Sequence, residues 1–231
     1  MSGGGDSVEQ QFAMIAGHEL RTPLTVLSGV LQLLARKPEF QDGESKRLVA
    51  IAVQETRYLQ GFVSSLVDVA RLRTGAMSLD THEYDLNEVI AAAVHRGCFV
   101  APGQEIRFVP HGERIPVRVD KMRVEQIVLN LLDNAAIHAP TSSNIDVRIT
   151  PGRRQASVHV QDYGRGLPEG DLERLFEPFT RRWESSVPSR AGLGVGLYVA
   201  RELARVQGGD LDAHSELGAG ATFELTLPIA A

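Results

Sequence analysis

Apolar residues recur at helical spacing over two long stretches of the chain, from Val8 to about Arg36 and from Ser45 to about Arg73. Pro38 and Gly43 interrupt the pattern between them and predict a turn. We therefore expect two antiparallel helices joined as a hairpin. A single hairpin cannot bury two apolar faces this broad, so we expect two copies to pair as a dimeric four-helix bundle. The alternative is that the hairpin packs on the remainder of its own chain.

The hydrophobic pattern changes after Thr74 and Gly75, where short runs replace the long helical ones. These two residues are themselves typical of a helix end followed by a linker. We therefore predict a flexible leader over residues 1–7, a helical hairpin over residues 8–74 and a second domain over residues 75–231.

Short strand-like and helical runs make up this second domain. Strands are expected at Met77–Asp80, Glu105–Val109, Pro116–Val119, Ile145–Ile149, Ala156–Val160, Asp210–His214 and Ala221–Leu227. Helices are expected from Asp85 to about Arg96, after a cap at Asp120, and over Leu193–Val206. Helices on one face of a mixed, mostly antiparallel sheet make an α/β sandwich, which is the fold class we expect.

Composition narrows the class of protein further. The chain is 43% hydrophobic and 23% charged, as globular proteins are, and no run approaches the ~20 apolar residues that span a bilayer. Its net charge of -5 argues weakly against non-specific nucleic-acid binding. The single cysteine, Cys98, excludes an internal disulfide and a cysteine-cluster metal site and fits a reducing, cytoplasmic compartment. Residues 1–5 lack the features of a signal peptide, so any membrane or sensor part of a parent protein is expected outside this chain.

The first helix carries an unusual polar group, Gly17-His-Glu-Leu-Arg-Thr-Pro23. His18 and Thr22 are four residues apart and therefore share one helix face. Pro23 cannot donate to the carbonyl oxygen of Glu19, so we expect the helix to bend beside the histidine. Glu19 could bind one imidazole nitrogen and leave the other as a nucleophile. A histidine on a helix is more often a solvated or core residue, so this hypothesis depends on the rest of the chain.

Two asparagines, Asn130 and Asn134, share a face of the helix that begins after Asp120. The rest of that stripe is Leu, Val and Ile, and an amide is costly to bury without a partner. Because amide oxygens can bind a hard cation, the pair predicts a magnesium site that carries phosphates and water. The alternative is a capped or solvated polar face.

A carboxylate and two glycines, Asp162, Gly164 and Gly166, come directly after a predicted strand. The carboxylate only accepts hydrogen bonds and suits the amino group of a base, while the glycines let the backbone approach a flat ligand closely. The alternative is a glycine-rich turn with no ligand. Further along, the glycines of Gly218–Phe223 are expected to shape a turn into the last strand rather than to contact a ligand.

Three more glycines, Gly192, Gly194 and Gly196, run straight into a predicted helix. The N–H groups and dipole at a helix N-terminus favour phosphate, although a lone triplet is weak and lacks the βαβ setting of a dinucleotide fold. The polar stretch Glu177–Ala191 lies just before them and predicts a mobile lid. Its arginines could meet a triphosphate or simply be solvated: Arg181, Arg182 and Arg190.

The order and spacing of these groups resemble the catalytic core of sensor histidine kinases. His18 to Leu24 is similar to the H box of that family, Asn130 to Asn134 to its N box, Asp162 to Gly166 to its G1 box, Phe176 to Phe179 to its F box, and Gly192 to Gly196 to its G2 box. Five boxes in the family order, over Val8 to Leu227, make the agreement specific.

The resemblance implies an ATP-dependent protein-histidine kinase, with a dimerisation and histidine-phosphotransfer hairpin followed by an ATP-binding domain of the Bergerat type. It implies that His18 is the phosphoacceptor, that Glu19 orients it as a base, and that Thr22 positions water when the same helix dephosphorylates a partner. The phosphoryl group would pass to an aspartate on a response regulator in two-component signalling. The implied partners are thus a second copy of the chain and a receiver domain, with no nucleic acid.

In the second domain the resemblance implies a site for ATP and Mg²⁺. Asn130 would hold Mg²⁺, Asn134 would contact phosphate or ribose, and Asp162 would bind the adenine amino group. The pocket walls and lid would be formed by Gly164, Gly166, Gly192, Gly194 and Gly196, with Arg181, Arg182 and Arg190 near the phosphates.

The sequence departs from the family at two positions. Ile137 stands where a lysine or arginine is common, so a phosphate-facing cation is missing unless a lid arginine replaces it. Gly17 stands where serine or alanine is common and should loosen the helix by up to ~1 kcal/mol. Ile137 keeps two alternatives open: a core that acts mainly as a response-regulator phosphatase, and a dimeric ATP-binding pseudokinase that serves as a scaffold.

Overall fold

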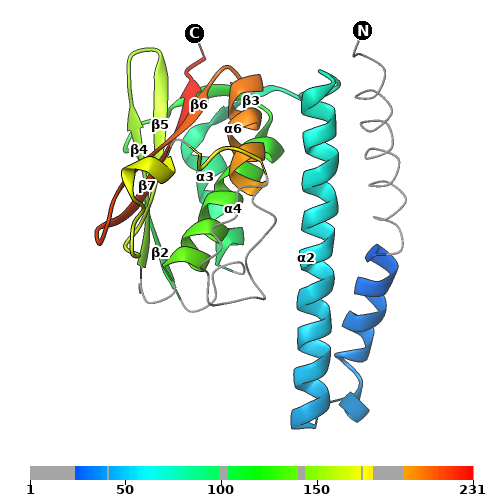
Figure 1. Cartoon of the computed structure of the whole chain (residues 1–231). Coiled ribbons are helices and arrows are strands. Elements are labelled where there is room, and N and C mark those ends of the chain that lie inside the picture. Colours follow the sequence, from blue (N-terminus) through cyan, green and yellow to red (C-terminus); the bar gives the residue numbers. More distant parts are fainter. Residues whose placement is uncertain are drawn as a thin grey trace, which may run out of the picture. The chain divides into compact units, whose positions relative to one another are not determined.

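The computed structural model describes residues 24–40, 42–98, 104–139, 144–172, 174–178 and 195–230. The chain divides into two compact units, Met1–Met77 and Ser78–Ala231, and each is described by itself (Figure 1). None of the helices in the described ranges combines the length and the apolar character that a membrane span requires.

The first unit contains the predicted helical hairpin. Residues 24–34 are helical, the 3-10 helix η1 (Pro38–Phe40) lies in the turn, and α2 (Gly43–Arg73) returns beside the first helix (Figure 1). Asp42 is the N-cap of α2, because its side chain accepts from a backbone N–H three residues on at 2.9 Å. Thr74 is the C-cap of α2, and Gly75 follows in a left-handed conformation with φ of 65°.

One face of α2 is buried at a seven-residue spacing. Val49, Thr56, Val63 and Ala70 are all buried, and this interval keeps a single seam along a helix. The Thr56 hydroxyl donates to the Ala52 carbonyl oxygen at 2.8 Å, so its burial leaves no unpaired donor. Other large apolar side chains of the hairpin are 41–63% exposed: Val26, Leu27, Val30, Leu33, Leu48, Ile51 and Leu59. A second copy would cover such a surface, and the four-helix bundle stays a prediction.

The second unit contains a five-stranded sheet in the order β2-β4-β5-β7-β6. Its strands are β2 (Glu105–Val109), β4 (Asn144–Pro151), β5 (Gln155–Asp162), β6 (Asp210–Glu216) and β7 (Gly220–Pro228). β2 pairs with β4 in parallel and the other neighbours are antiparallel, so the predicted mixed, mostly antiparallel sheet is confirmed.

A separate two-stranded ribbon pairs β1 (His82–Asp85) with β3 (Pro116–Val119). The strand predicted at Met77–Asp80 is therefore wrong, and the ribbon gives the reason. The antiparallel register runs from Asp85 opposite Pro116 to His82 opposite Val119. After Val119 the chain turns into a helix, so β3 offers no partner to residues 77–80.

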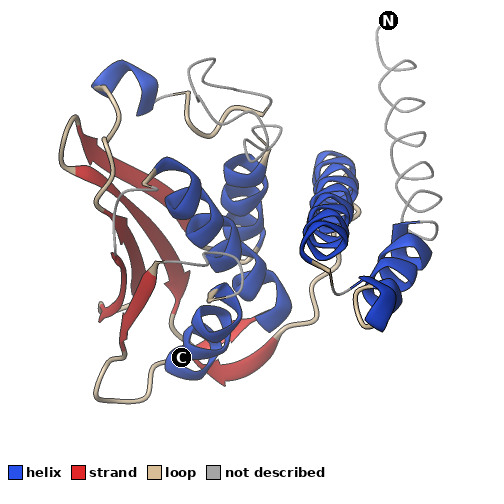
Figure 2. Ribbon diagram, turned by 90° about the horizontal axis from the view of Figure 1, so that it is seen from below, coloured by secondary structure: helices blue, strands red, loops and turns tan. Residues whose placement is uncertain are grey.

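Three helices cover one face of the five-stranded sheet and complete the predicted α/β sandwich (Figure 2). They are α3 (Leu86–Gly97), α4 (Lys121–His138) and α6 (Gly196–Val206), while the short α5 (Glu169–Leu172) follows β5 along the chain. The predicted start of α6 at Leu193 lies outside the described residues.

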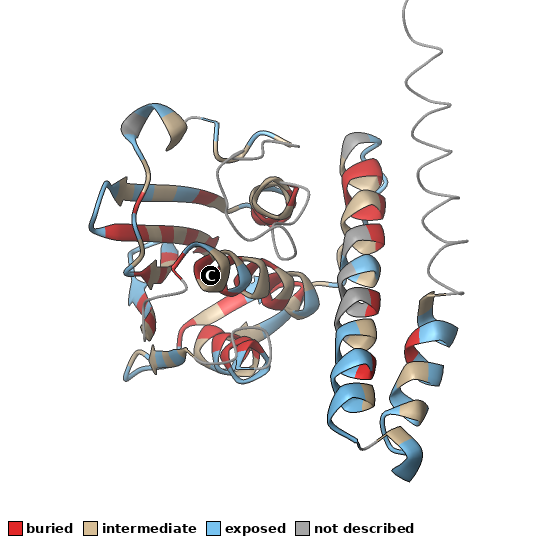
Figure 3. Cartoon of the chain, turned by 60° about the horizontal axis from the view of Figure 1, so that its bottom comes forward, coloured by how far each residue is buried: buried red, intermediate tan, exposed pale blue. Residues whose placement is uncertain are grey.

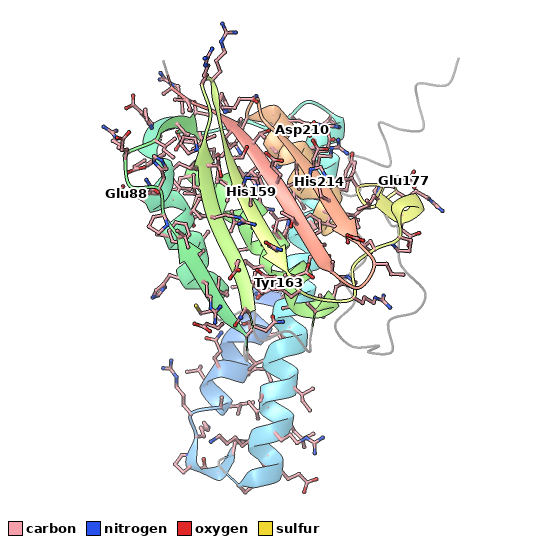
Figure 4. All side chains as sticks on the ribbon, turned by 90° about the vertical axis from the view of Figure 1, so that its left-hand side faces the viewer. Glu88, His159, Tyr163, Glu177, Asp210 and His214 are labelled. Carbon is pink, nitrogen blue, oxygen red and sulfur yellow. The ribbon has the colours of Figure 1, made fainter. Side chains whose placement is uncertain are left out.

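Buried residues lie on the strands of the sheet and on the helices that cover it (Figure 3). In β5 every second residue is buried: Ala156, Val158, Val160 and Asp162. Asp162 is the polar member of this row, at the end of the strand. Within the described ranges no helix covers the opposite face of the sheet, and this open face carries His159 and His214 (Figure 4). The alternation thus directs one carboxylate toward the helices.

Asp120 joins three segments at the start of α4. One of its carboxylate oxygens accepts a hydrogen bond from the Arg123 N–H at 3.2 Å, so Asp120 is the N-cap that the sequence predicts. The other oxygen accepts from the Asp80 N–H at 3.1 Å, and the Asp120 N–H donates to the Gln207 side chain at 2.9 Å. The segment before β1 and the end of α6 are therefore both tied to the helix that carries Asn130.

Candidate functional site

Helix α4 carries both asparagines of the predicted magnesium site. Asn130 and Asn134 are half-buried and four residues apart, on one face of the helix. The Asn130 side-chain nitrogen donates to the Gly196 carbonyl oxygen at 3.2 Å, which joins α4 to the first residue of α6. This bond uses the amide nitrogen and orients the group, so the amide oxygen is available to a cation.

The loop after β5 approaches the other end of α4. A Cβ on Gly164 would lie 2.8 Å from the His138 carbonyl oxygen and 2.8 Å from the Ala139 Cβ, so glycine permits this approach and a larger residue would not. The eight helical steps from residue 130 to residue 138 span about 12 Å. The structure thus brings Gly196 to one end of this stretch and Gly164 to the other, with Asn134 between them.

Asp162 ends β5 on the buried face of the sheet and is 4% exposed. Its carboxylate accepts from the Gly164 N–H at 2.9 Å and also from the Ala221 N–H. Burial raises the pKa of this carboxyl above its ordinary value, although the two N–H donors oppose the shift. A dehydrated carboxylate with acceptor capacity to spare suits a ligand that donates, such as the amino group of a base.

Two glycines hold this loop against the turn between β6 and β7. Gly166 has φ of 68°, and a Cβ there would collide with the Glu216 carbonyl oxygen. Gly220 has φ of 86°, and a Cβ there would collide with the Asp162 carbonyl oxygen. Gly164 and Gly166 therefore let the loop pack closely beside Asp162, and their place in a nucleotide pocket stays a prediction. The predicted turn into the last strand is also confirmed, because residues 217–219 form it.

Helix α6 presents its N-terminus to the Asn130 side chain. The N-cap residue, Val195, has no polar side chain with which to cap the first turn. The first N–H groups and the positive end of the helix dipole can therefore meet an anion such as phosphate. Gly196 is the described part of the predicted phosphate loop. Outside the described residues lie the remaining predicted site residues: Gly192, Gly194, Arg181, Arg182, Arg190, His18, Glu19 and Thr22.

The described residues fit a magnesium ion that arrives with phosphates. Among them, no group of three or more His, Cys, Asp or Glu side chains could hold a metal on its own. Mg²⁺ keeps several waters and takes one or two protein oxygens together with phosphate oxygens, so one amide oxygen from Asn130 is sufficient. Ile137 is half-buried near the end of α4 and adds no charge there.

Sequence reasoning missed two side chains that support the site. Arg201 in α6 places its guanidinium 4.6 Å from the ring centroid of Phe176 and binds Asp210 at 3.2 Å and Asp212 at 3.4 Å. Ser215 in β6 makes hydrogen bonds with the backbone of two other segments. Phe176 and Leu167 are distant in the sequence from Arg201 and Ser215, and no local pattern indicates such pairings.

Two family models match the chain. The model described as His Kinase A (phospho-acceptor) domain matches residues 8–75. The model described as Histidine kinase-, DNA gyrase B-, and HSP90-like ATPase matches residues 119–231. The first match covers the helical hairpin and the second covers α4, α6 and most of the five-stranded sheet.

Proteins named as sensors or sensor kinases are similar over nearly the whole chain. The sensor histidine kinase MtrB of Mycolicibacterium paratuberculosis is 31% identical over 225 residues, which is 96% of this chain and 40% of MtrB. The alginate biosynthesis sensor protein KinB of Pseudomonas aeruginosa is 28% identical over 97% of this chain and 38% of KinB. The chain therefore spans less than half the length of these relatives.

A solved structure shares the fold. The crystal structure of full-length ShkA in complex with AMPPNP is similar with a TM-score of 0.75 and 24% sequence identity. The match covers 96% of this chain and 46% of that protein, and at this identity it supports the fold alone.

Proposed function

The chain belongs to the sensor histidine kinases, with a His kinase A domain and a histidine-kinase-type ATPase domain, and we propose that it transfers the γ-phosphoryl group of ATP to His18. A neutral imidazole nitrogen of His18 attacks the γ-phosphorus, the bond from that phosphorus to the β–γ bridging oxygen breaks, and ADP leaves. The phosphoryl group then passes from His18 to an aspartate carboxylate on the receiver domain of a response regulator.

The observation that supports ATP most directly is the buried carboxylate of Asp162. It accepts backbone N–H groups and offers further acceptor capacity beside a loop that glycine holds close to α4. A base amino group donates to such a carboxylate, whereas a base carbonyl oxygen is repelled by it. Asn134, about one helical turn before the point where this loop meets α4, is proposed to contact phosphate or ribose.

The phosphates are proposed to lie at the N-terminus of α6. Asn130 would hold Mg²⁺ through its amide oxygen, and Mg²⁺ supplies charge neutralisation for the transferring group when it is bound. The first N–H groups of α6 would bind phosphate oxygens, and Gly196 leaves room for them. We propose that further contacts to the phosphates come from Gly192 and Gly194 and from the lid residues Arg181, Arg182 and Arg190.

On the hairpin, Glu19 is proposed to orient the imidazole of His18, and Thr22 to position water for the reverse reaction on a phosphorylated partner. The exposed apolar side chains of residues 24–34 and of α2 support a homodimer. We place the hinge between the two steps near Gly75, because the nucleotide domain has to reach His18 for the first step and leave it for the second. The proposed location is the cytoplasm.

Ile137 favours one alternative. Without a basic residue at that position, transfer to His18 could be slow, and a core that mainly dephosphorylates its response regulator through Glu19 and Thr22 would then result. A pseudokinase that only binds ATP as a dimer is the other alternative. Both predict ATP binding without rapid labelling of His18.

Incubation with γ-labelled ATP and Mg²⁺ tests the proposal. We expect acid-labile label on the wild-type chain and none on His18→Ala, while His82→Ala, a change at an exposed histidine of the second unit, should leave labelling intact. Wild-type protein that binds ATP and takes up no label would refute the kinase and favour one of the two alternatives. Label that persists in His18→Ala would refute the assignment of the nucleophile.

A further inference from the structure

The hydroxyl of Ser215 lies between two backbone segments of the candidate site. Its Oγ accepts from the Leu167 N–H at 2.8 Å and donates to the Gly220 carbonyl oxygen at 2.6 Å. A hydroxyl has one donor and two acceptor positions, so it can make both bonds at once. Ser215 thereby joins the loop after β5 to the first residue of β7.

Both segments that Ser215 holds are in contact with Asp162. Gly220 packs so closely on the Asp162 carbonyl oxygen that a Cβ would collide with it. The next residue, Ala221, donates its N–H to the Asp162 carboxylate. Leu167 ends the glycine-containing loop whose Gly164 N–H also donates to this carboxylate. Both N–H donors of the carboxylate therefore belong to segments that the Ser215 hydroxyl fastens together.

We propose that Ser215 is a positioning residue for nucleobase selection: it fixes the carboxylate of Asp162 in the orientation that accepts an amino group of the base. Ser215 itself would not touch the nucleotide. The inference rests on the proposed function, in which Asp162 binds adenine. A simple structural bond would contribute to the stability of the unit and leave the choice of base unaffected, and this difference can be measured.

The test compares ATP with inosine triphosphate, in which a carbonyl oxygen replaces the adenine amino group. Both affinities are measured by calorimetric titration of the whole chain in the presence of Mg²⁺. We expect Ser215→Ala to weaken ATP binding about tenfold, since two backbone bonds are lost, and inosine triphosphate binding by less than about twofold. Ser215→Thr keeps the hydroxyl and should restore the preference for ATP.

Tyr163→Phe is the matched control. The Tyr163 hydroxyl donates to Asp146 at 2.5 Å, so this change also removes one side-chain hydroxyl from the neighbourhood of Asp162, but on the open face of the sheet (Figure 4). It should leave both affinities unchanged. In autophosphorylation assays, Ser215→Ala should raise the KM for ATP and leave kcat at saturating ATP within about twofold of wild type.

Two results would overturn the inference and are distinguishable. A wild-type preference for ATP that Ser215→Ala retains, with both nucleotides weakened equally or not at all, would show that Ser215 is merely structural. Equal binding of ATP and inosine triphosphate by the wild type would refute the role of Asp162 and, with it, the inference. If Ser215→Ala does not fold by circular dichroism, Ser215→Cys replaces it, with the same loss of preference expected.

Discussion

Replacing Asp162 with asparagine would separate what this side chain does for the fold from what it does for the ligand. The change keeps size and shape but removes the charge. In the wild type, Oδ1 accepts from the Gly164 N–H at 2.9 Å and the carboxylate also accepts from the Ala221 N–H. Asparagine has one acceptor oxygen, and its NH₂ group only donates. If the oxygen keeps the backbone bonds, the NH₂ group faces the proposed adenine amino group and two donors meet.

The size of the effect on binding follows from the lost interaction. A hydrogen bond to a charged group contributes about 1.5–3 kcal/mol, and about 1.4 kcal/mol corresponds to a tenfold change in affinity. We therefore expect Asp162→Asn to bind ATP about 10- to 100-fold more weakly. Affinity for inosine triphosphate should stay constant or rise, because its carbonyl oxygen can accept from the new amide.

Asp162→Asn should weaken ATP binding but make the folded domain more stable. Because burial raises the pKa of Asp162 above its ordinary value of 3.8, the folded domain holds this proton more tightly than the unfolded chain does. The stability that this group contributes is therefore complete below pH 3.8 and is lost as the pH rises through the raised pKa. Asp162→Asn removes this dependence, so its unfolding free energy relative to wild type should increase over that pH range.

Urea denaturation at several pH values and calorimetric titration of ATP would measure both effects. Asp146→Asn is the matched control, since Asp146 lies on β4 and accepts from Tyr163 on the opposite face of the sheet. It should leave ATP affinity unchanged. ATP binding by Asp162→Asn within about threefold of wild type would refute the nucleobase role. A variant much less stable than wild type at neutral pH would show instead that the carboxylate is needed for the fold.

Three further changes test how the site is supported. Asp120→Ala removes the cap of α4 and a hydrogen bond to the segment before β1. The free energy of unfolding of the second unit, measured in urea, should therefore fall by about 2 kcal/mol. An unchanged urea midpoint would contradict this. Gly166→Ala adds a Cβ that collides with the Glu216 carbonyl oxygen, at a residue whose φ is 68°. The free energy of unfolding should fall by about 2 kcal/mol or more, and ATP binding should weaken. Normal ATP affinity would refute the tight fit. Arg201→Met removes the cation–π contact with Phe176 and two ion pairs. The free energy of unfolding should fall by about 1 kcal/mol, and by more at low salt than at high salt. A loss of stability that does not depend on salt would argue against an electrostatic role.

Local signals in the sequence were enough to predict most of the elements. Asp85 and Asp120 were recognised as helix starts, and both accept backbone N–H groups in the first turn of their helices. The two strands at Glu105–Val109 and Pro116–Val119 have the predicted bounds. Such signals act over a few residues, because a cap bonds to the same turn and an alternating run depends on its own side chains.

The site itself was only partly readable from the sequence. The carboxylate after a strand and the asparagines on one helix face could be named, because their types and spacing suit nucleotide chemistry. The burial of Asp162 could not be predicted from the sequence, because it depends on which face of the sheet the helices cover. The roles of the residues outside the described ranges, His18 among them, stay predictions.

Pairings between distant segments were decided by the tertiary structure. The strand predicted at Met77–Asp80 failed because a strand needs a partner, and the register of β3 places that partner beside His82–Asp85 instead. The bond from Ser215 to the Leu167 N–H crosses 48 residues of sequence. Hydrophobic periodicity and caps report how a segment folds on itself, whereas these contacts exist only once the sheet and its helices have brought separate segments together.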